Sequence, residues 1–228
     1  MSKNNPILQV KDLTVSFNAF AGKVQAVRGV SFDLNKGETL CIVGESGSGK
    51  SVTNKAIMGI LSKNAVIDRG EILYDGMDLT KLTEEQFCQI RGKRIAMVFQ
   101  DPLSALNPIM KVGKQITETL CVHQKLSHEQ AKKRALELMA AVGIPEPEKR
   151  FNQYPFQFSG GMRQRIVIVI ALACNPEILI CDEPTTALDV TIQSKILDLI
   201  KEIKQERNLS VIFITHNMGV VANMADRI

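Results

Sequence analysis

The chain has 228 residues and a mass of 25.2 kDa, which suits one large domain, or one domain with a subdomain, better than two independent domains. Hydrophobic residues make up 45% and charged residues 23%, close to the globular average, so a disordered or fibrous protein is excluded. The net charge of +4 is modest and is not gathered in a basic block, which gives little support to a nucleic-acid partner.

Cysteines and apolar runs indicate the compartment. The five cysteines form an odd set without a C-x-x-C pair, which argues against a disulfide framework and against a zinc site. Residues 1–6 lack the apolar core of a secretory signal. The longest apolar run, residues 166–174, is far shorter than the roughly 20 residues of a membrane span. We therefore expect a cytoplasmic protein.

The first hundred residues predict strands that lead into a loop and a helix. Branched or alternating apolar residues predict strands over 7–17, 24–34 and 39–43. Helical spacing begins at Lys50, and a further strand is expected over 71–74. Thr83 and Gln86 have the spacing of a capping box, so a short helix should begin there. A strand over 95–99 then ends beside Gln100.

The second half alternates helices and strands after a helical stretch. Helical periods cover 112–124 and 127–142, and a proline-containing connector follows. We interpret residues 102 to about 158 as a helical subdomain inserted into an α/β core. The remaining elements are a helix over about 161–174, a strand over 178–181, a helix over 190–206, a strand over 210–215 and a last helical stretch. This alternation predicts a largely parallel sheet covered by helices.

A phosphate-binding loop follows the third strand. Residues 44–51 match the pattern G-x-x-x-x-G-K-[ST] between a predicted strand and a predicted helix. Glycines let main-chain NH groups surround phosphates, Lys50 would reach the β and γ phosphates, and the Ser51 hydroxyl would bind magnesium. The loop consists of Gly44, Glu45, Ser46, Gly47, Ser48, Gly49, Lys50 and Ser51.

Two acids end the apolar strand over 178–181. In a P-loop fold the first, Asp182, should meet the magnesium held near Ser51. The second, Glu183, is placed to polarise a water for attack on the γ-phosphate. An acidic pair after a strand is by itself usually a solvated loop, but the phosphate-binding loop upstream favours the functional interpretation.

A glycine pair precedes the apolar helix of the second half. Ser159 has the chemistry of an N-cap, and the NH groups of Gly160 and Gly161 would point at whatever lies in front of the helix. A phosphate group is the ligand expected at such a helix N-terminus. Taken alone, however, the segment is better explained as an ordinary capped helix.

These motifs in this order resemble ABC ATPases. Ser159-Gly160-Gly161 resembles the family's signature, Asp182-Glu183-Pro184 its Walker B motif, and 187–189 (Ala-Leu-Asp) its D-loop. The resemblance covers residues 7–228. It implies that Gln100 is the Q-loop glutamine, near the metal and linked to the helical subdomain, and that His216 is the switch histidine. A lone histidine after a strand would otherwise more often be structural.

The resemblance also implies the fold. We expect an α/β P-loop NTPase of ABC type: a mostly parallel core sheet, an antiparallel β portion near the N-terminus and the helical insert. The core would comprise residues 1–101 and 159–228 of one nucleotide-binding domain, with the signature helix following the subdomain at 102–158. Relatives continue beyond the switch histidine, so the chain looks truncated at Ile228.

Family membership would divide each ATP site between two subunits placed head to tail. Lys50 and magnesium would neutralise the phosphates. The magnesium would be held by Ser51, Gln100 and Asp182. Residues 159–161 of the other subunit would face the same nucleotide. Glu183 would act on the water and His216 near the γ-phosphate. For the aromatic side chain that stacks on adenine, Phe17 is favoured over Phe20, and core packing is as good an explanation for either.

Within the family, residues 99–108 and 158–165 are similar to the ATPases of dipeptide and oligopeptide importers, with nickel importers close by. Met162 stands where the wider family has Gln, as in the peptide-importer form. The implied partners are two membrane permeases, a second ATPase subunit that is the same or a homologous chain, and indirectly an extracytoplasmic solute-binding protein. The protein would sit peripherally on the cytoplasmic face of the membrane.

Other functions remain open from the sequence. A soluble ABC protein acting on nucleic acid or ribosomes would use the same ATP switch, but the chain lacks a basic tract or a zinc-ligand set that would favour it, and no nucleic acid is expected. A small-molecule P-loop kinase is disfavoured by the Ser159-Gly160-Gly161 segment and His216. Nickel or another small solute remains an alternative cargo.

Overall fold

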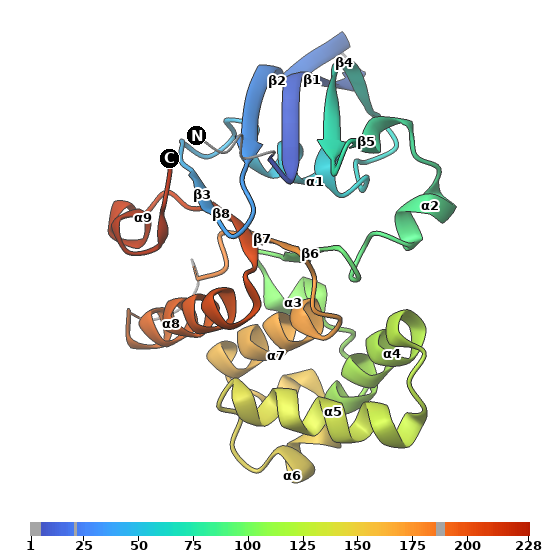
Figure 1. The fold of residues 1–228 in the computed structure, drawn as a ribbon, viewed down its shortest axis with the longest axis vertical. Coiled ribbons are helices and arrows are strands. Elements are labelled where there is room, and N and C mark those ends of the chain that lie inside the picture. The colour runs from blue at the N-terminus through green and yellow to red at the C-terminus, as the bar shows by residue number, and fades with distance from the viewer. Residues whose placement is uncertain (1–5, 21, 186–189) are drawn as a thin grey trace. The chain divides into compact units, whose positions relative to one another are not determined.

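The computed structural model describes residues 6–20, 22–185 and 190–228. They form two compact units, the first drawn from Met1–Arg91 and Asn208–Ile228 and the second from Gly92–Arg207 (Figure 1). Among the described residues, no helix is both long and apolar enough to cross a membrane. The subdomain boundaries expected at 102 and 158 remain a prediction.

An antiparallel sheet occupies the N-terminal part of the first unit. Its strands lie in the order β2-β1-β4-β5 (Figure 1). On β1, Leu8, Val10, Leu13 and Val15 are buried, and the bulges along the strand change which positions face the core. The strand bounds are β1 Leu8–Ala19, β2 Gly22–Leu34, β4 Ala65–Tyr74 and β5 Met77–Asp78.

The strand β4 is longer than the expected 71–74. The unexpected part, residues 65–70, contains Asp68, Arg69 and Gly70 and lacks the apolar alternation of a core strand. Gly70 has φ 103°, and a Cβ there would lie 2.6 Å from the main chain of β1. Glycine therefore allows β4 to approach β1 closely, which residue hydrophobicity alone does not indicate.

The first unit also contains a parallel strand pair. β3 and β8 pair in register from Thr39 with Val211 to Ile42 with Ile214, and all five residues of β8 are buried. Thr83 and Gln86 form the expected capping box at the start of α2. The elements are β3 Thr39–Ile42, β8 Ser210–Ile214, α1 Lys50–Ile57, the 3₁₀ turn Leu79–Lys81, α2 Glu84–Cys88 and α9 Met218–Met224.

The second unit contains another parallel pair and most of the helices. β6 and β7 pair in register from Ile95 with Ile178 to Val98 with Cys181. The helix α5 begins with a capping box formed by Ser127 and Gln130. The elements are β6 Ile95–Val98, β7 Ile178–Asp182, α3 Pro102–Ala105, α4 Val112–Gln124, α5 His128–Ala141, α6 Pro147–Phe151, the 3₁₀ turn Pro155–Gln157, α7 Gly160–Leu172 and α8 Val190–Arg207.

The segment after α9 returns to the start of β3. Arg227 Nε donates to Glu38 Oε1 at 2.6 Å, and the Thr39 amide donates to Asp226 Oδ2 at 2.8 Å. Burial alone would raise the pKa of the Glu38 carboxyl, but hydrogen bonds from Arg227 and from the Asn35 amide lower this pKa overall below its ordinary value of 4.5. The ion pair therefore helps to fix the strand that leads into the glycine-rich loop.

We predict that Glu38→Gln lowers the free energy of unfolding at pH 7 by about 1.5–3 kcal/mol, the range for hydrogen bonds to charged groups. Because folding lowers the Glu38 pKa, its contribution is present above the unfolded-state pKa and is lost as the pH falls through the folded-state value. The difference between parent and variant should shrink below pH 4.5. Urea unfolding at pH 7 and at acid pH measures this difference in the free energy of unfolding. A pH-independent difference would contradict this account.

The start of α7 packs tightly against α8. A Cβ added at Gly161 would lie 2.6 Å from Ile192 Cγ2, closer than carbon atoms approach. We predict that Gly161→Ala destabilises the fold by about 1–3 kcal/mol through overpacking. Ile192→Ala removes the clashing methyl group, so the double variant should recover part of that loss. Additive losses in a double-mutant cycle would disprove the packing explanation.

Candidate nucleotide-binding site

The glycine-rich loop lies between β3 and α1, as predicted. It leaves β3 after Ile42, and α1 begins at Lys50. Gly49 has φ 93°, and a Cβ there would lie 2.4 Å from the carbonyl oxygen of Ala26. Only glycine fits this position, because both the backbone conformation and the close approach exclude a side chain. The first turn of α1 has no side-chain cap, which is typical of helices whose NH groups face an anion.

The Lys50 side chain folds back over the loop. Its ammonium group donates to the carbonyl oxygens of Gly44 at 2.7 Å and Glu45 at 2.6 Å, and to Ser48 Oγ at 3.2 Å. The cation thus lies within the curve of the loop, where it can exchange these acceptors for phosphate oxygens, which bind ammonium more strongly. Ser51 follows in the first turn of α1 and is partly buried.

A pocket of about 620 Å³ adjoins the loop. Gly44, Gly49 and Lys50 line part of it, together with residues of β2 and β3 and Arg227. Its volume falls within the usual range for small-molecule sites. The loop therefore borders a space of ligand size within the first unit.

His216 follows the strand that pairs with β3. Because Ile42 and Ile214 are parallel partners, the loop and the residues after β8 leave the sheet at the same end. His216 is exposed there, whereas the neighbouring Asn217 caps α9 by accepting from the Gly219 amide at 2.9 Å. The expected switch histidine is thus placed on the same sheet edge as the phosphate-binding loop.

The second unit brings Gln100 and Glu183 together. Gln100 Nε2 donates to Glu183 Oε2 at 3.1 Å. The register explains the contact, because Val98 and Cys181 are partners and the two side chains follow two residues later. Asp182 is 6% exposed at the end of β7, and Glu183 has φ 47°, a strained conformation for a residue with a side chain. The sequence alone did not predict this hydrogen bond.

Ser159 caps α7 as expected. Its Oγ accepts from the Met162 amide at 3.4 Å, and both Ser159 and Gly160 are exposed. Arg163 Nε donates to the carbonyl oxygen of Phe158 at 2.9 Å and so holds the turn before the helix. The start of α7 therefore presents an exposed serine and glycine on a fixed turn.

The two aromatic candidates for adenine stacking belong to the first unit. Phe17 is partly buried on β1, where it pairs with Val24 and Ala65, and Phe20 is fully exposed. The preference for Phe17 over Phe20 stays a prediction. The D-loop residues 187–189 lie outside the described residues. Lys50, Ser51 and His216 belong to the first unit, whereas Gln100, Ser159–Gly161, Asp182 and Glu183 belong to the second.

Comparison with known sequences identifies close relatives. Residues 27–186 match the family described as ABC transporter. The chain is 61% identical over 97% of its length to the oligopeptide transport ATP-binding protein OppD of Bacillus subtilis, and 57% identical over 97% to the dipeptide transport ATP-binding protein DppD of Lactococcus lactis. It spans 62% and 64% of those two proteins.

Solved structures share the fold. The ATP-binding cassette MJ0796, solved as a dimer in a post-hydrolysis state with ADP and Pi, is 30% identical with a TM-score of 0.85, covering 95% of this chain and 91% of that one. CbiO1 from Clostridium perfringens is 28% identical with a TM-score of 0.79, covering 97% and 83%. These matches confirm the predicted fold, which combines an antiparallel N-terminal sheet, a parallel core sheet and a helical insert. The chain belongs to the ABC transporter family.

Proposed function

We propose that this chain is the ATP-binding and ATP-hydrolysing subunit of an importer for dipeptides or oligopeptides. The observation that carries this proposal is the 57–61% identity, over 97% of the chain, to proteins named for oligopeptide and dipeptide transport. The phosphate-binding loop, with Lys50 inside its curve, supports ATP as the ligand. The similarity to a cassette solved with ADP and Pi supports hydrolysis.

In this proposal Lys50 neutralises the β and γ phosphates of ATP, while Ser51, Gln100 and Asp182 hold Mg²⁺. Their hydroxyl, amide and carboxylate oxygens are the hard ligands that Mg²⁺ prefers. Bound magnesium would supply charge neutralisation at the phosphate oxygens. The burial of Asp182 at the end of β7 supports its role, because a buried side chain on a strand end has little room to reorient.

Glu183 then polarises the attacking water, and His216 acts near the γ-phosphate. The hydrogen bond from Gln100 Nε2 supports this role, because it orients the Glu183 carboxylate while Gln100 itself belongs to the segment that enters the helical insert. A glutamine placed in this way can couple the state of that segment to the orientation of the base. Phe17 stacks on adenine, with Phe20 as the alternative.

A second ATPase subunit, identical or homologous, completes each site by placing its Ser159, Gly160 and Gly161 against the nucleotide. The exposure of Ser159 and Gly160 at the start of α7 supports this arrangement, as does the dimeric form of the solved cassette. Two membrane permeases dock onto the helical insert, and a solute-binding protein delivers cargo to them. The subunit acts at the cytoplasmic face of the membrane, and no nucleic acid takes part.

Glu183→Gln tests the catalytic assignment. The amide keeps the size of the side chain but cannot accept the proton of water, so hydrolysis should fall by the ~10² to 10⁴ typical of losing a general base. ATP binding should survive, because Lys50, Ser51 and Asp182 are unchanged. Phosphate release and equilibrium ATP binding measure the two effects separately.

Glu177→Gln is the matched control, because it makes the same chemical change at a carboxylate that pairs with Arg94 in the same unit. It should leave turnover close to that of the parent. Near-parental turnover in Glu183→Gln would show that the base lies elsewhere. In cells that depend on this chain, Glu183→Gln should also abolish uptake of a labelled dipeptide. If the variant lost only the uptake of nickel, peptide would be rejected as the cargo.

A further inference from the structure

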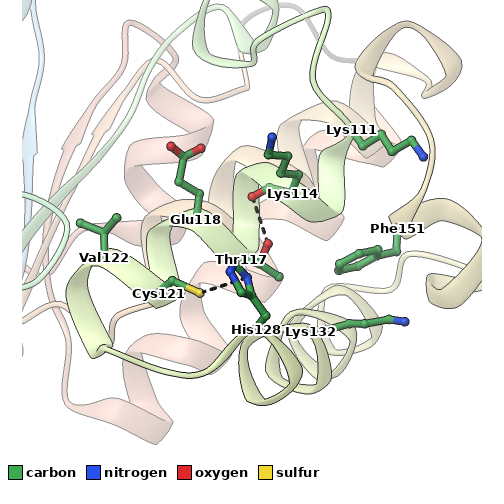
Figure 2. A pocket seen from close by; sticks show the side chains of 9 residues that line it. All are labelled: Lys111, Lys114, Thr117, Glu118, Cys121, Val122, His128, Lys132 and Phe151. Carbon is green, nitrogen blue, oxygen red and sulfur yellow. Dashed lines mark hydrogen bonds between the residues drawn. The ribbon is translucent and has the colours of Figure 1, made fainter.

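A pocket of about 510 Å³ lies among α4, α5 and α6, within the second unit (Figure 2). Residues of all three helices line it, including Lys114 and Cys121 of α4, His128 and Lys132 of α5, and Phe151 of α6. Its volume is that of a site for a small organic molecule. None of its residues belongs to the candidate nucleotide site.

The wall formed by α4 follows from helical spacing. Lys114, Glu118 and Cys121 are separated by four and three residues, so they share one face of the helix. The opposite face buries Ile116 and Leu120 in the core. The pocket face is therefore an outward stripe of α4, and only the neighbouring helices convert it into a concave surface.

Phe151 provides a fixed apolar surface at one end of the pocket. Its ring packs against Gly113 so closely that a Cβ at Gly113 would lie 2.4 Å from ring atoms. Lys132 Nζ lies 5.9 Å from the centre of the same ring, within range of a cation–π interaction. Val122, which is 66% exposed, extends the apolar lining at the other end (Figure 2).

Positive charge dominates the rim. Lys111, Lys114 and Lys132 are exposed, and none of them has a carboxylate partner within the part of the chain that the structure describes. Glu118 is the single carboxylate in the lining. Three ammonium groups against one carboxylate, beside an apolar wall, attract an anion and retain it if it also carries apolar surface.

We propose that this pocket binds a small amphiphilic organic anion, with an aromatic or aliphatic body against Phe151 and Val122 and a carboxylate or sulfonate group near the lysines. The proposal does not depend on the proposed ATPase function. Its test therefore uses binding and thiol chemistry rather than ATP turnover.

Cys121 is a built-in reporter for the pocket. Its Sγ lies 3.9 Å from His128 Nδ1 (Figure 2). Cys88 is exposed on α2, outside the pocket, and serves as the internal reference. The other three cysteines, Cys41, Cys174 and Cys181, are buried.

The probe is 5,5′-dithiobis(2-nitrobenzoate), an aromatic disulfide with two carboxylates. The Cys121 thiolate attacks one sulfur of the reagent, a protein–reagent disulfide forms, the reagent's own S–S bond breaks, and one thionitrobenzoate leaves with the electron pair. The thiol proton passes to His128 or to solvent. Cystamine, a cationic disulfide, reacts by the same balanced exchange and differs in charge.

The reaction rate of Cys121 with the anionic disulfide should saturate as the reagent concentration rises, because binding precedes the exchange. For each cysteine, the preference is the reaction rate with the anionic reagent divided by the rate with cystamine. At low salt this ratio should be at least about tenfold larger for Cys121 than for Cys88, which is the scale of electrostatic steering in a charged cleft. The unreactive anion 1-anilinonaphthalene-8-sulfonate should protect Cys121 and leave Cys88 reactive. Cys121→Ser and Cys88→Ser assign the two rates.

Lys114→Ala combined with Lys132→Ala should abolish both saturation and the charge preference. Lys133→Ala is the matched control, because Lys133 is exposed on the same helix but does not line the pocket. Circular dichroism verifies that each variant is folded. A rate that rises linearly with reagent, or a preference that survives the double lysine substitution, would overturn the proposal.

Discussion

Parallel pairing of short, buried strands is the constraint on which the candidate site depends. β3 pairs with β8 in the first unit and β6 with β7 in the second, and every residue of β6, β7 and β8 is buried. A parallel pair releases both chains at the same edge, so the residues that follow the two strands become neighbours. The phosphate-binding loop, Gln100, Glu183 and His216 follow the ends of these strands.

The consequence is clearest in the second unit, where the register is fixed by apolar partners such as Val98 and Cys181. Two residues further on, this register places Gln100 beside Glu183, and their side chains form a hydrogen bond at 3.1 Å. Core packing and the geometry of the proposed base are therefore linked. A change that shifted β6 against β7 by one residue would bury polar groups and separate the pair.

The sequence predicted the elements whose local motifs, such as helix caps and glycine loops, agree with the tertiary structure around them. The capping box at Thr83, the N-cap at Ser159 and the loop before Lys50 have signals confined to a few residues, and all form as expected. The first half of β4 was missed because its residues do not alternate, and its extension depends on the close approach that Gly70 allows. Tertiary contact, not propensity, determines that segment.

The sequence proposed candidate residues for the site but not the contacts among them. Motif spacing predicted roles for Lys50, Asp182 and Glu183, and those roles stay a prediction, whereas the hydrogen bond between Gln100 and Glu183 emerged only from the strand register. The pocket beside Phe151 was not predicted either, and in the sequence its α4 wall is the stripe of Lys114, Glu118 and Cys121. That stripe is indistinguishable from a solvated helix face until α5 and α6 are placed against it.

We propose that the phosphate-binding loop and Asp182 act on one MgATP molecule. The most direct measurement is the equilibrium affinity for ATP with magnesium and with a chelator, in the parent and in Asp182→Asn. Magnesium should strengthen ATP binding in the parent, and Asp182→Asn should lose this strengthening while it retains the magnesium-free affinity that Lys50 and the loop provide. An unchanged magnesium dependence in Asp182→Asn would contradict it.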